Sequence, residues 1–131
     1  MELRDTSTTP PTERQLLDDL RETLAETLPA DWRVAVQAAP RYADATLVLT
    51  APDGRTAEVL VEAKSLVNAR DIPAIRAQLG LLDGGSDTWG LVASRYLSPR
   101  AREVLASTGV SYADATGNLR LQLSEPGLFL L

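Results

Sequence analysis

The sequence predicts an α/β protein with a mixed central sheet flanked by helices. Segments with helical periodicity and segments with strand periodicity alternate along the chain. A tight turn between two apolar strands predicts antiparallel pairing, and a helix between two later strands predicts a parallel crossover. With 131 residues, of which 44% are hydrophobic and 24% charged, the chain has the size and balance of one globular domain.

The first predicted elements are a disordered lead-in and a leucine-rich helix. Residues 1–11 are polar and rich in Thr and Pro, which predicts disorder, so the domain is assigned to residues 12–131. Thr12, with Gln15 three residues later, predicts a capped helix start. Residues 32–38 follow as a strand. The apolar stripe of the helix consists of leucines: Leu16, Leu17, Leu20, Leu24 and Leu28.

A hairpin is predicted around residues 51–54, because the sequence Ala-Pro-Asp-Gly favours chain reversal and pairs residues 45–50 with 57–62. Alternation along the second strand places Glu62 and Lys64 on one face. Pairing also brings Asp44 to the Glu62 end. Two carboxylates so close repel each other, and a divalent cation bound by their oxygens keeps both ionised. These residues are therefore a candidate metal site.

The second half of the chain predicts a helix, a strand, another helix and a short hairpin. Asp71 and Pro73 predict the start of a helix whose apolar stripe runs from residue 72 to 82, followed by a turn at residues 83–86. Residues 89–94 predict a buried strand parallel to the one that carries Glu62. Ser98 and Gly109 bracket a third helix. The remaining predicted parts are a brief strand at 110–112, a turn at 114–118, a strand at 119–123, and at 127–131 either a further strand or the cut end of a longer chain.

Composition narrows the chemistry open to this chain. There is no cysteine and no histidine, which excludes disulfides, thiolate nucleophiles and histidine-dependent triads. A hard cation such as Mg²⁺ fits the Asp, Glu and Lys that remain. The net charge of −5 argues against strong independent binding to a polyanion. The N-terminus lacks the apolar segment of a signal peptide, so a cytoplasmic location without a membrane partner is expected.

Asp44, the hairpin and the Glu62-Ala63-Lys64 triplet resemble the signature of the PD-(D/E)XK nuclease superfamily, which has the restriction-endonuclease-like fold. The predicted order αβββαβ, followed by a C-terminal helix and short hairpin, is similar to the core of that superfamily. The resemblance implies that Asp44 and Glu62 bind Mg²⁺ or Mn²⁺ and that Lys64 positions the attacking water. One departure is Ala43, where the family signature has proline.

Four further residues are candidates. In the superfamily an acid on the first helix often joins the site, which implies Glu13, and some members use a glutamine on the second helix, which implies Gln78. Arg95 and Arg100 are candidate phosphate contacts. Each has a structural alternative. Glu13 suits the first turn of a helix, Gln78 suits a helix surface, and the arginines suit a solvated surface.

The segment 91–121 resembles the tail of AbiEi-like antitoxin regulators. The match rests on a Tyr-x-Asp-x-x-Gly-Asn turn formed by Tyr112, Asp114, Gly117 and Asn118. These residue types are also ordinary turn formers. The resemblance implies the N-terminal part of a longer transcriptional regulator.

Two main functions are consistent with these observations. The first is a Mg²⁺-dependent endonuclease domain that acts on DNA, assisted by another domain or subunit. The second is a non-catalytic, nuclease-derived module of a DNA-binding regulator or antitoxin. A third is a protein-interaction domain, including a homodimer, that docks through its apolar C-terminus.

Overall fold

The computed structural model describes residues 13–38, 43–79, 89–124 and 127–131. Its helices are α1 (Glu13–Thr27), the 3₁₀ turn η2 (Ala69–Asp71), α2 (Ile72–Gln78) and α3 (Pro99–Ser107). Its strands are β1 (Arg33–Gln37), β2 (Ala45–Thr50), β3 (Thr56–Lys64), β4 (Trp89–Ser94), β5 (Ser111–Asp114), β6 (Leu119–Ser124) and β7 (Gly127–Leu130). The predicted lead-in at 1–11, the Thr12 cap and the turn at 83–86 lie outside the described residues. None of the helices in these ranges is both long and apolar enough to span a bilayer.

The strands form one mixed sheet in the order β1-β2-β3-β4-β5-β6-β7. The pairs β3–β4 and β4–β5 are parallel, and the other neighbours are antiparallel. This is the predicted α/β class with a mixed central sheet. The segment at 127–131 supplies a further strand, which pairs with β6.

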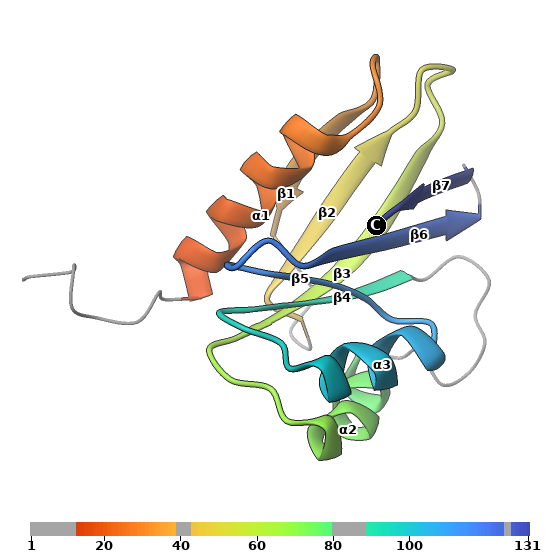
Figure 1. Cartoon of the computed structure of the whole chain (residues 1–131). Helices are drawn as coiled ribbons and strands as arrows, with labels where there is room; N and C mark the ends of the chain where they lie inside the picture. Colours follow the sequence, from red (N-terminus) through yellow and green to blue (C-terminus); the bar gives the residue numbers. More distant parts are fainter. Residues whose placement is uncertain (1–12, 39–42, 80–88, 125–126) are drawn as a thin grey trace, which may run out of the picture.

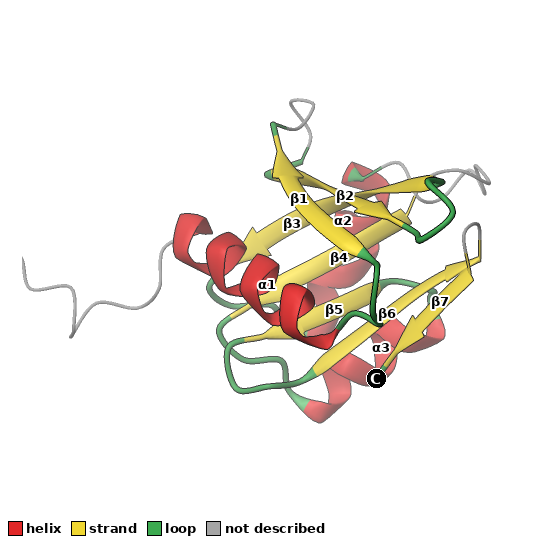
Figure 2. Ribbon diagram, turned by 90° about the horizontal axis from the view of Figure 1, so that it is seen from above, coloured by secondary structure: helices red, strands yellow, loops and turns green. Residues whose placement is uncertain are grey.

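The helices cover both faces of the sheet, with α1 on one face and α2 and α3 on the other (Figure 1, Figure 2). The predicted leucine stripe of α1 is confirmed, because Leu16, Leu20 and Leu24 are buried against the sheet. On the other face Ile72 and Ile75 of α2 are buried in a second cluster. The rest of the predicted α2 stripe beyond Leu79 lies outside the described residues.

Strand β3 lies inside the sheet and is covered on both faces. Its odd-numbered residues Val59, Val61 and Ala63 belong to the cluster under α1, whereas Leu60 belongs to the cluster under α2 and α3. Glu62 and Lys64 share the face of Leu60 because side chains alternate along a strand. The sheet therefore directs both charged side chains toward α2.

The hairpin register differs from the prediction by one residue. Residues 45–50 pair with 56–61, so that Ala45 lies opposite Val61 and Thr50 opposite Thr56. The turn takes in Arg55, whose carbonyl accepts the Ala51 amide at 2.8 Å, and Gly54 adopts φ 90°, where a side chain would be strained. This register continues to Asp44, whose amide donates to the Val61 carbonyl at 2.9 Å and which therefore lies directly opposite Glu62.

Helix α3 begins as its sequence predicts, whereas α2 does so only in part. The Ser98 hydroxyl accepts the Ala101 amide at 3.1 Å, which is an N-cap, and Gly109 follows the helix with φ 78°. Asp71 lies at the predicted start of α2, but its carboxylate accepts the Asn68 amide at 3.0 Å and makes no cap hydrogen bond to α2. The intervening 3₁₀ turn explains this difference, because Asp71 is also its last residue.

Candidate functional site

Three of the predicted site residues meet at the C-terminal end of β3. Glu62 is only 4% exposed although it is an acid, and it lies opposite Asp44 across the β2–β3 pair. Lys64, two residues further on the same face, places its Nζ 3.3 Å from Glu62 Oε2. An acid is seldom buried without partners, and here its partners come from the neighbouring strand and from its own.

Asp44 is held in place by a backbone contact with the sheet and by the neighbouring Glu62 side chain. Its Oδ2 accepts the Ala63 amide at 2.8 Å. The residue is exposed to solvent, and its carboxylate also hydrogen-bonds the neighbouring Glu62 side chain. This backbone contact fixes the Asp44 carboxylate beside the end of β3, where Glu62 and Lys64 emerge.

Gln78, at the last position of α2, also reaches the site. Its Nε2 donates to Glu62 Oε1 at 3.2 Å. Glu62 thus has the amide of Gln78 on one oxygen and the ammonium of Lys64 on the other. The arrangement holds the Glu62 carboxylate in one orientation.

The pKa of Glu62 is raised above its ordinary value. Burial is the main cause because it disfavours the charged form, and the charge and hydrogen bonding of the neighbouring Asp44 add to the rise. Lys64 acts in the opposite direction without cancelling these effects. A buried acid whose pKa is shifted by burial and a neighbouring charge is a common property of functional sites.

The residues present fit a Mg²⁺ ion. Asp44 and Glu62 offer hard oxygen donors, and the mutual repulsion of their carboxylates is what a cation between them would relieve. In the described part of the chain no cluster of three or more Asp, Glu, His or Cys side chains is placed to hold a metal. Two carboxylates are nevertheless consistent with Mg²⁺, which commonly keeps several waters and takes one or two carboxylates from a protein.

In the described part of the chain, no hydrogen bond or ion pair joins the other candidates to Asp44, Glu62 or Lys64, although Arg95 lies nearby. Glu13 is exposed at the start of α1, which covers the opposite face of the sheet. Arg95 is exposed directly after β4, next to Ser94, which pairs with Lys64. Arg100 is exposed on α3 and donates to Glu103 at 2.9 Å. The roles assigned to these three residues stay predictions.

The Tyr-x-Asp-x-x-Gly-Asn segment forms a turn around one carboxylate. Asp114 accepts five hydrogen bonds, from the amides of Leu97, Thr116 and Asn118 and from the side chains of Thr116 and Asn118. Burial acts to raise the pKa of Asp114, but these hydrogen bonds together lower it below its ordinary value. The turn-former interpretation is confirmed. The sequence did not indicate that Asp114 also binds Leu97, in a distant loop.

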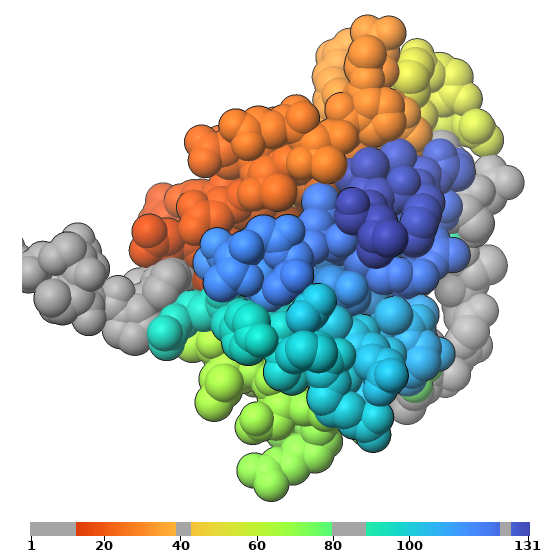
Figure 3. Space-filling view, in the orientation of Figure 1, coloured from red at the N-terminus to blue at the C-terminus, as the bar shows by residue number. Residues whose placement is uncertain are grey.

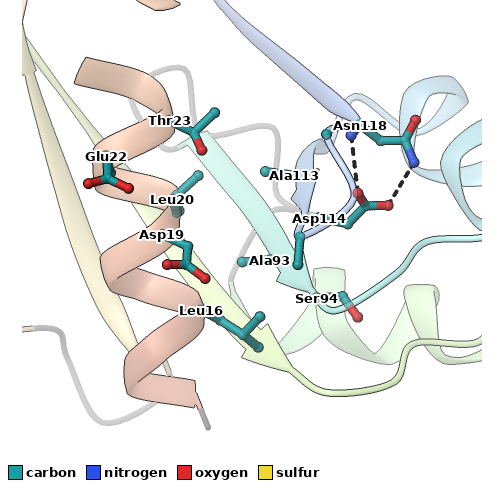
Figure 4. Close-up of a pocket in the computed structure, with 12 residues that line it drawn as sticks. Leu16, Asp19, Leu20, Glu22, Thr23, Ala93, Ser94, Ala113, Asp114 and Asn118 are labelled. Atoms are coloured by element: carbon teal, nitrogen blue, oxygen red, sulfur yellow. Dashed lines mark hydrogen bonds between the residues drawn. The ribbon is translucent and has the colours of Figure 1, made fainter. Parts of the chain in front are cut away.

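A cavity of about 210 Å³ lies between α1 and the ends of β4 and β5 (Figure 4). It does not contain the Glu62 cluster, which faces α2. Figure 4 shows Asp114 turned toward Asn118, with two hydrogen bonds between them. The polar residues that line the cavity are Asp19, Glu22, Thr23, Ser94, Asp114 and Asn118.

No protein-family model matches the sequence, and no curated protein matches it either. Three solved structures are similar to the chain. EndoMS in apo form has a TM-score of 0.51 at 14% identity, covering 79% of this chain and 45% of that one. An EndoMS–dsDNA complex has a TM-score of 0.48 at 14% identity, and the match covers 87% of this chain and 48% of that one. A repair endonuclease from Pyrococcus abyssi has a TM-score of 0.44 at 12% identity, and the match covers 87% of this chain and 48% of that one.

The chain therefore spans less than half the length of each of these proteins. At 14% identity the similarity to apo EndoMS establishes the fold and nothing finer. The mixed sheet of seven strands, with α1 on one face and α2 and α3 on the other, is a nuclease-like α/β fold of the restriction-endonuclease-like kind.

Proposed function

We propose that this chain is a metal-dependent nuclease domain that hydrolyses phosphodiester bonds in DNA, with Asp44, Glu62 and Lys64 as its site. The observation that carries the proposal is the buried Glu62 carboxylate, held by Lys64 and Gln78 opposite Asp44. The restriction-endonuclease-like fold supports it, because in the superfamily that the motif resembles an Asp, a Glu and a Lys occupy corresponding places. Because the match covers only 45% of the apo EndoMS chain, full activity is proposed to need another domain or subunit.

Each residue has a proposed task. Asp44 and Glu62 would hold Mg²⁺ or Mn²⁺, which when bound stabilises charge on the phosphate and lowers the pKa of a water molecule. Lys64, with 43% of its side chain exposed, is open to solvent on one side and would orient the attacking water with its ammonium. Gln78 keeps the Glu62 carboxylate in position by donating to Oε1.

The test is a cleavage assay on plasmid, single-stranded and branched DNA with Mg²⁺ or Mn²⁺. Asp44→Ala and Lys64→Ala are each expected to lower the rate about 1,000-fold, because several kcal/mol of charge stabilisation or water positioning is lost. Glu58→Ala is the matched control, since Glu58 is an exposed acid on the same strand and face. A wild-type protein that gives no metal-dependent product and binds no metal by calorimetry would sink the enzymatic proposal.

Gln78→Ala is expected to raise the Mg²⁺ concentration needed for half-maximal cleavage about 10-fold or more, as is typical when a partner that orients a metal ligand is removed. Titrating Mg²⁺ at saturating DNA measures this, and the maximal rate at high Mg²⁺ should largely recover. Gln122→Ala is the control, because Gln122 is an exposed glutamine on β6. An unchanged Mg²⁺ requirement would show that Gln78 does not position Glu62.

The second candidate is a non-catalytic module of a DNA-binding regulator, as the AbiEi-like resemblance implies. Two observations favour it. The chain carries a net charge of −5, and both carboxylate oxygens of Glu62 have protein partners, Lys64 and Gln78. This candidate predicts DNA binding that is unaffected by Asp44→Ala and an absence of metal-dependent cleavage.

A further inference from the structure

Two exposed apolar side chains lie at the edge of the sheet where β3 and β4 end. Leu66, after β3, is 70% exposed and Tyr96, after β4, is 51% exposed. Both follow strands that are mostly buried toward their C-terminal ends. The other large exposed hydrophobic residues lie on the two edge strands or at the last residue of the chain: Val36, Phe129 and Leu131. Large apolar side chains exposed together beside a candidate site indicate a binding surface.

The two loops are joined next to Lys64. Lys64 lies opposite Ser94 in the β3–β4 register. The buried Ser94 hydroxyl donates to the Ser65 carbonyl at 3.2 Å and lies 3.5 Å from the Tyr96 carbonyl. Figure 3 shows the segments after β3, in green, and after β4, in teal, side by side on the surface. The loops that carry Leu66 and Tyr96 therefore lie next to each other beside the candidate site.

The backbone around Tyr96 is fixed, although its side chain is exposed. The Leu97 amide donates to Asp114 Oδ2 at 2.9 Å. The Ala115 amide donates to the carbonyls of Ser94 and Arg95 at 3.1 and 3.2 Å. Arg102 Nε donates to the Leu97 carbonyl at 3.1 Å. A tyrosine on so constrained a loop loses little conformational freedom when it binds a partner.

Exposed cations lie on both loops, next to the acids Asp44 and Glu62 of the candidate site and Asp71 of η2. Lys64 precedes Leu66, Arg95 precedes Tyr96, and Arg70 lies in η2, which follows the first loop. The exposed carboxylates of α1 cover the opposite face of the sheet: Glu13, Asp18, Asp19, Glu22 and Glu26. A DNA strand therefore meets cations on the loops after β3 and β4, whereas acids outnumber cations on α1.

We propose that Tyr96 and Leu66, flanked by Arg95, form a stacking platform for an unpaired base, and that the DNA which enters the site is single-stranded or locally unpaired. Aromatic side chains beside cations bind successive bases of a single strand through their faces, whereas a continuous duplex hides those faces by stacking. This inference rests on the proposed function for the identity of the polymer. In this proposal the turn around Asp114 also positions Tyr96, because Asp114 accepts the amide of the next residue, Leu97.

The test is binding of fluorescent oligonucleotides to the full chain in EDTA, so that cleavage does not interfere. A single strand and the blunt duplex of the same sequence are compared by anisotropy, and 2-aminopurine in the single strand reports stacking. Wild type is expected to bind the single strand at least 10-fold more tightly and to change the 2-aminopurine emission. Tyr96→Ala should weaken single-strand binding about 10-fold and remove the emission change, whereas Tyr96→Phe should retain both.

Phe129→Ala is the matched control, because Phe129 is an exposed aromatic residue on β7, stacked under Arg120 at 5.2 Å. Equal binding of single strand and duplex, or a Tyr96→Ala protein that binds like wild type, overturns the platform even if the protein cleaves DNA. In that case the exposed Leu66 and Tyr96 side chains would serve as a contact for another protein. Tyr96-dependent binding without metal-dependent cleavage supports the platform and rejects the enzyme. A folded protein that binds neither oligonucleotide overturns the platform, and the cleavage assay with Mg²⁺ or Mn²⁺ decides the nuclease proposal separately.

Discussion

Replacing Glu62 by Gln is expected to abolish metal-dependent cleavage while raising the free energy of unfolding at neutral pH by about 1 kcal/mol, within the usual range for a stabilising substitution. Glutamine keeps the shape of the side chain but cannot carry the charge that a cation needs. It also relieves the cost of a buried carboxylate that faces Asp44. Loss of activity together with a gain in stability is typical of a residue kept for chemistry.

The stability gain should depend on pH in a defined direction. The pKa of Glu62 is raised in the folded state by burial and by Asp44, so folding becomes less favourable as pH rises from the ordinary value of 4.5 through the folded pKa. Glu62→Gln removes this pH-dependent loss of stability, because glutamine does not ionise. Urea unfolding without metal should therefore show the largest difference between variant and wild type near neutral pH. The difference should shrink as the pH falls below 4.5.

A control variant and a metal titration test whether these effects are specific to Glu62. Glu58→Gln, on the same face of β3 but exposed, should leave stability and cleavage unchanged. Added Mg²⁺ should raise the melting temperature of wild type and not that of Glu62→Gln, because a ligand stabilises only a protein that binds it. A Glu62→Gln protein less stable than wild type at pH 7 would show that Glu62 serves mainly as a structural partner of Lys64 and Gln78.

Replacing Asp114 by Asn is expected to lower the free energy of unfolding by about 2–3 kcal/mol, because hydrogen bonds to a charged acceptor are lost and amide donors remain without partners. Asp114 accepts hydrogen bonds from the turn at 116–118 and from Leu97. An asparagine side chain has only one acceptor oxygen to serve them. Urea unfolding at pH 7 measures the loss.

The pH dependence here has the opposite sign to that of Glu62. Because the folded pKa of Asp114 is lowered, its stabilisation is present above the ordinary value of 3.8 and is lost as pH falls through the folded pKa. The deficit of Asp114→Asn should therefore be full at neutral pH and diminish in strong acid. Asp53→Asn is the control, since Asp53 lies in the β2–β3 turn and its exposed carboxylate accepts from the Arg55 amide and Nε. An equal loss at Asp53 would mean that the coupling to Leu97 contributes nothing.

Much of the fold is predictable because its causes are local. The leucine spacing of α1, the Ser98 cap of α3, and the alternation of Leu119, Leu121 and Leu123 are each set by neighbours in sequence. The exact register of the β2–β3 hairpin was not predictable to the residue, because the turn includes Arg55. A shift of one residue decides what lies opposite Glu62.

The sequence by itself determined the order of elements, the β3 face shared by Glu62 and Lys64, and the absence of histidine and cysteine chemistry. Only the tertiary structure decided that Asp44 lies directly opposite Glu62, that Gln78 donates to Glu62, and that Asp114 holds the loop carrying Tyr96. The physical reason is distance along the chain. Periodicity and turn chemistry act over a few residues, whereas the angle at which α2 packs on the sheet, and the approach of the 114–118 turn to Leu97, follow from packing of the whole domain.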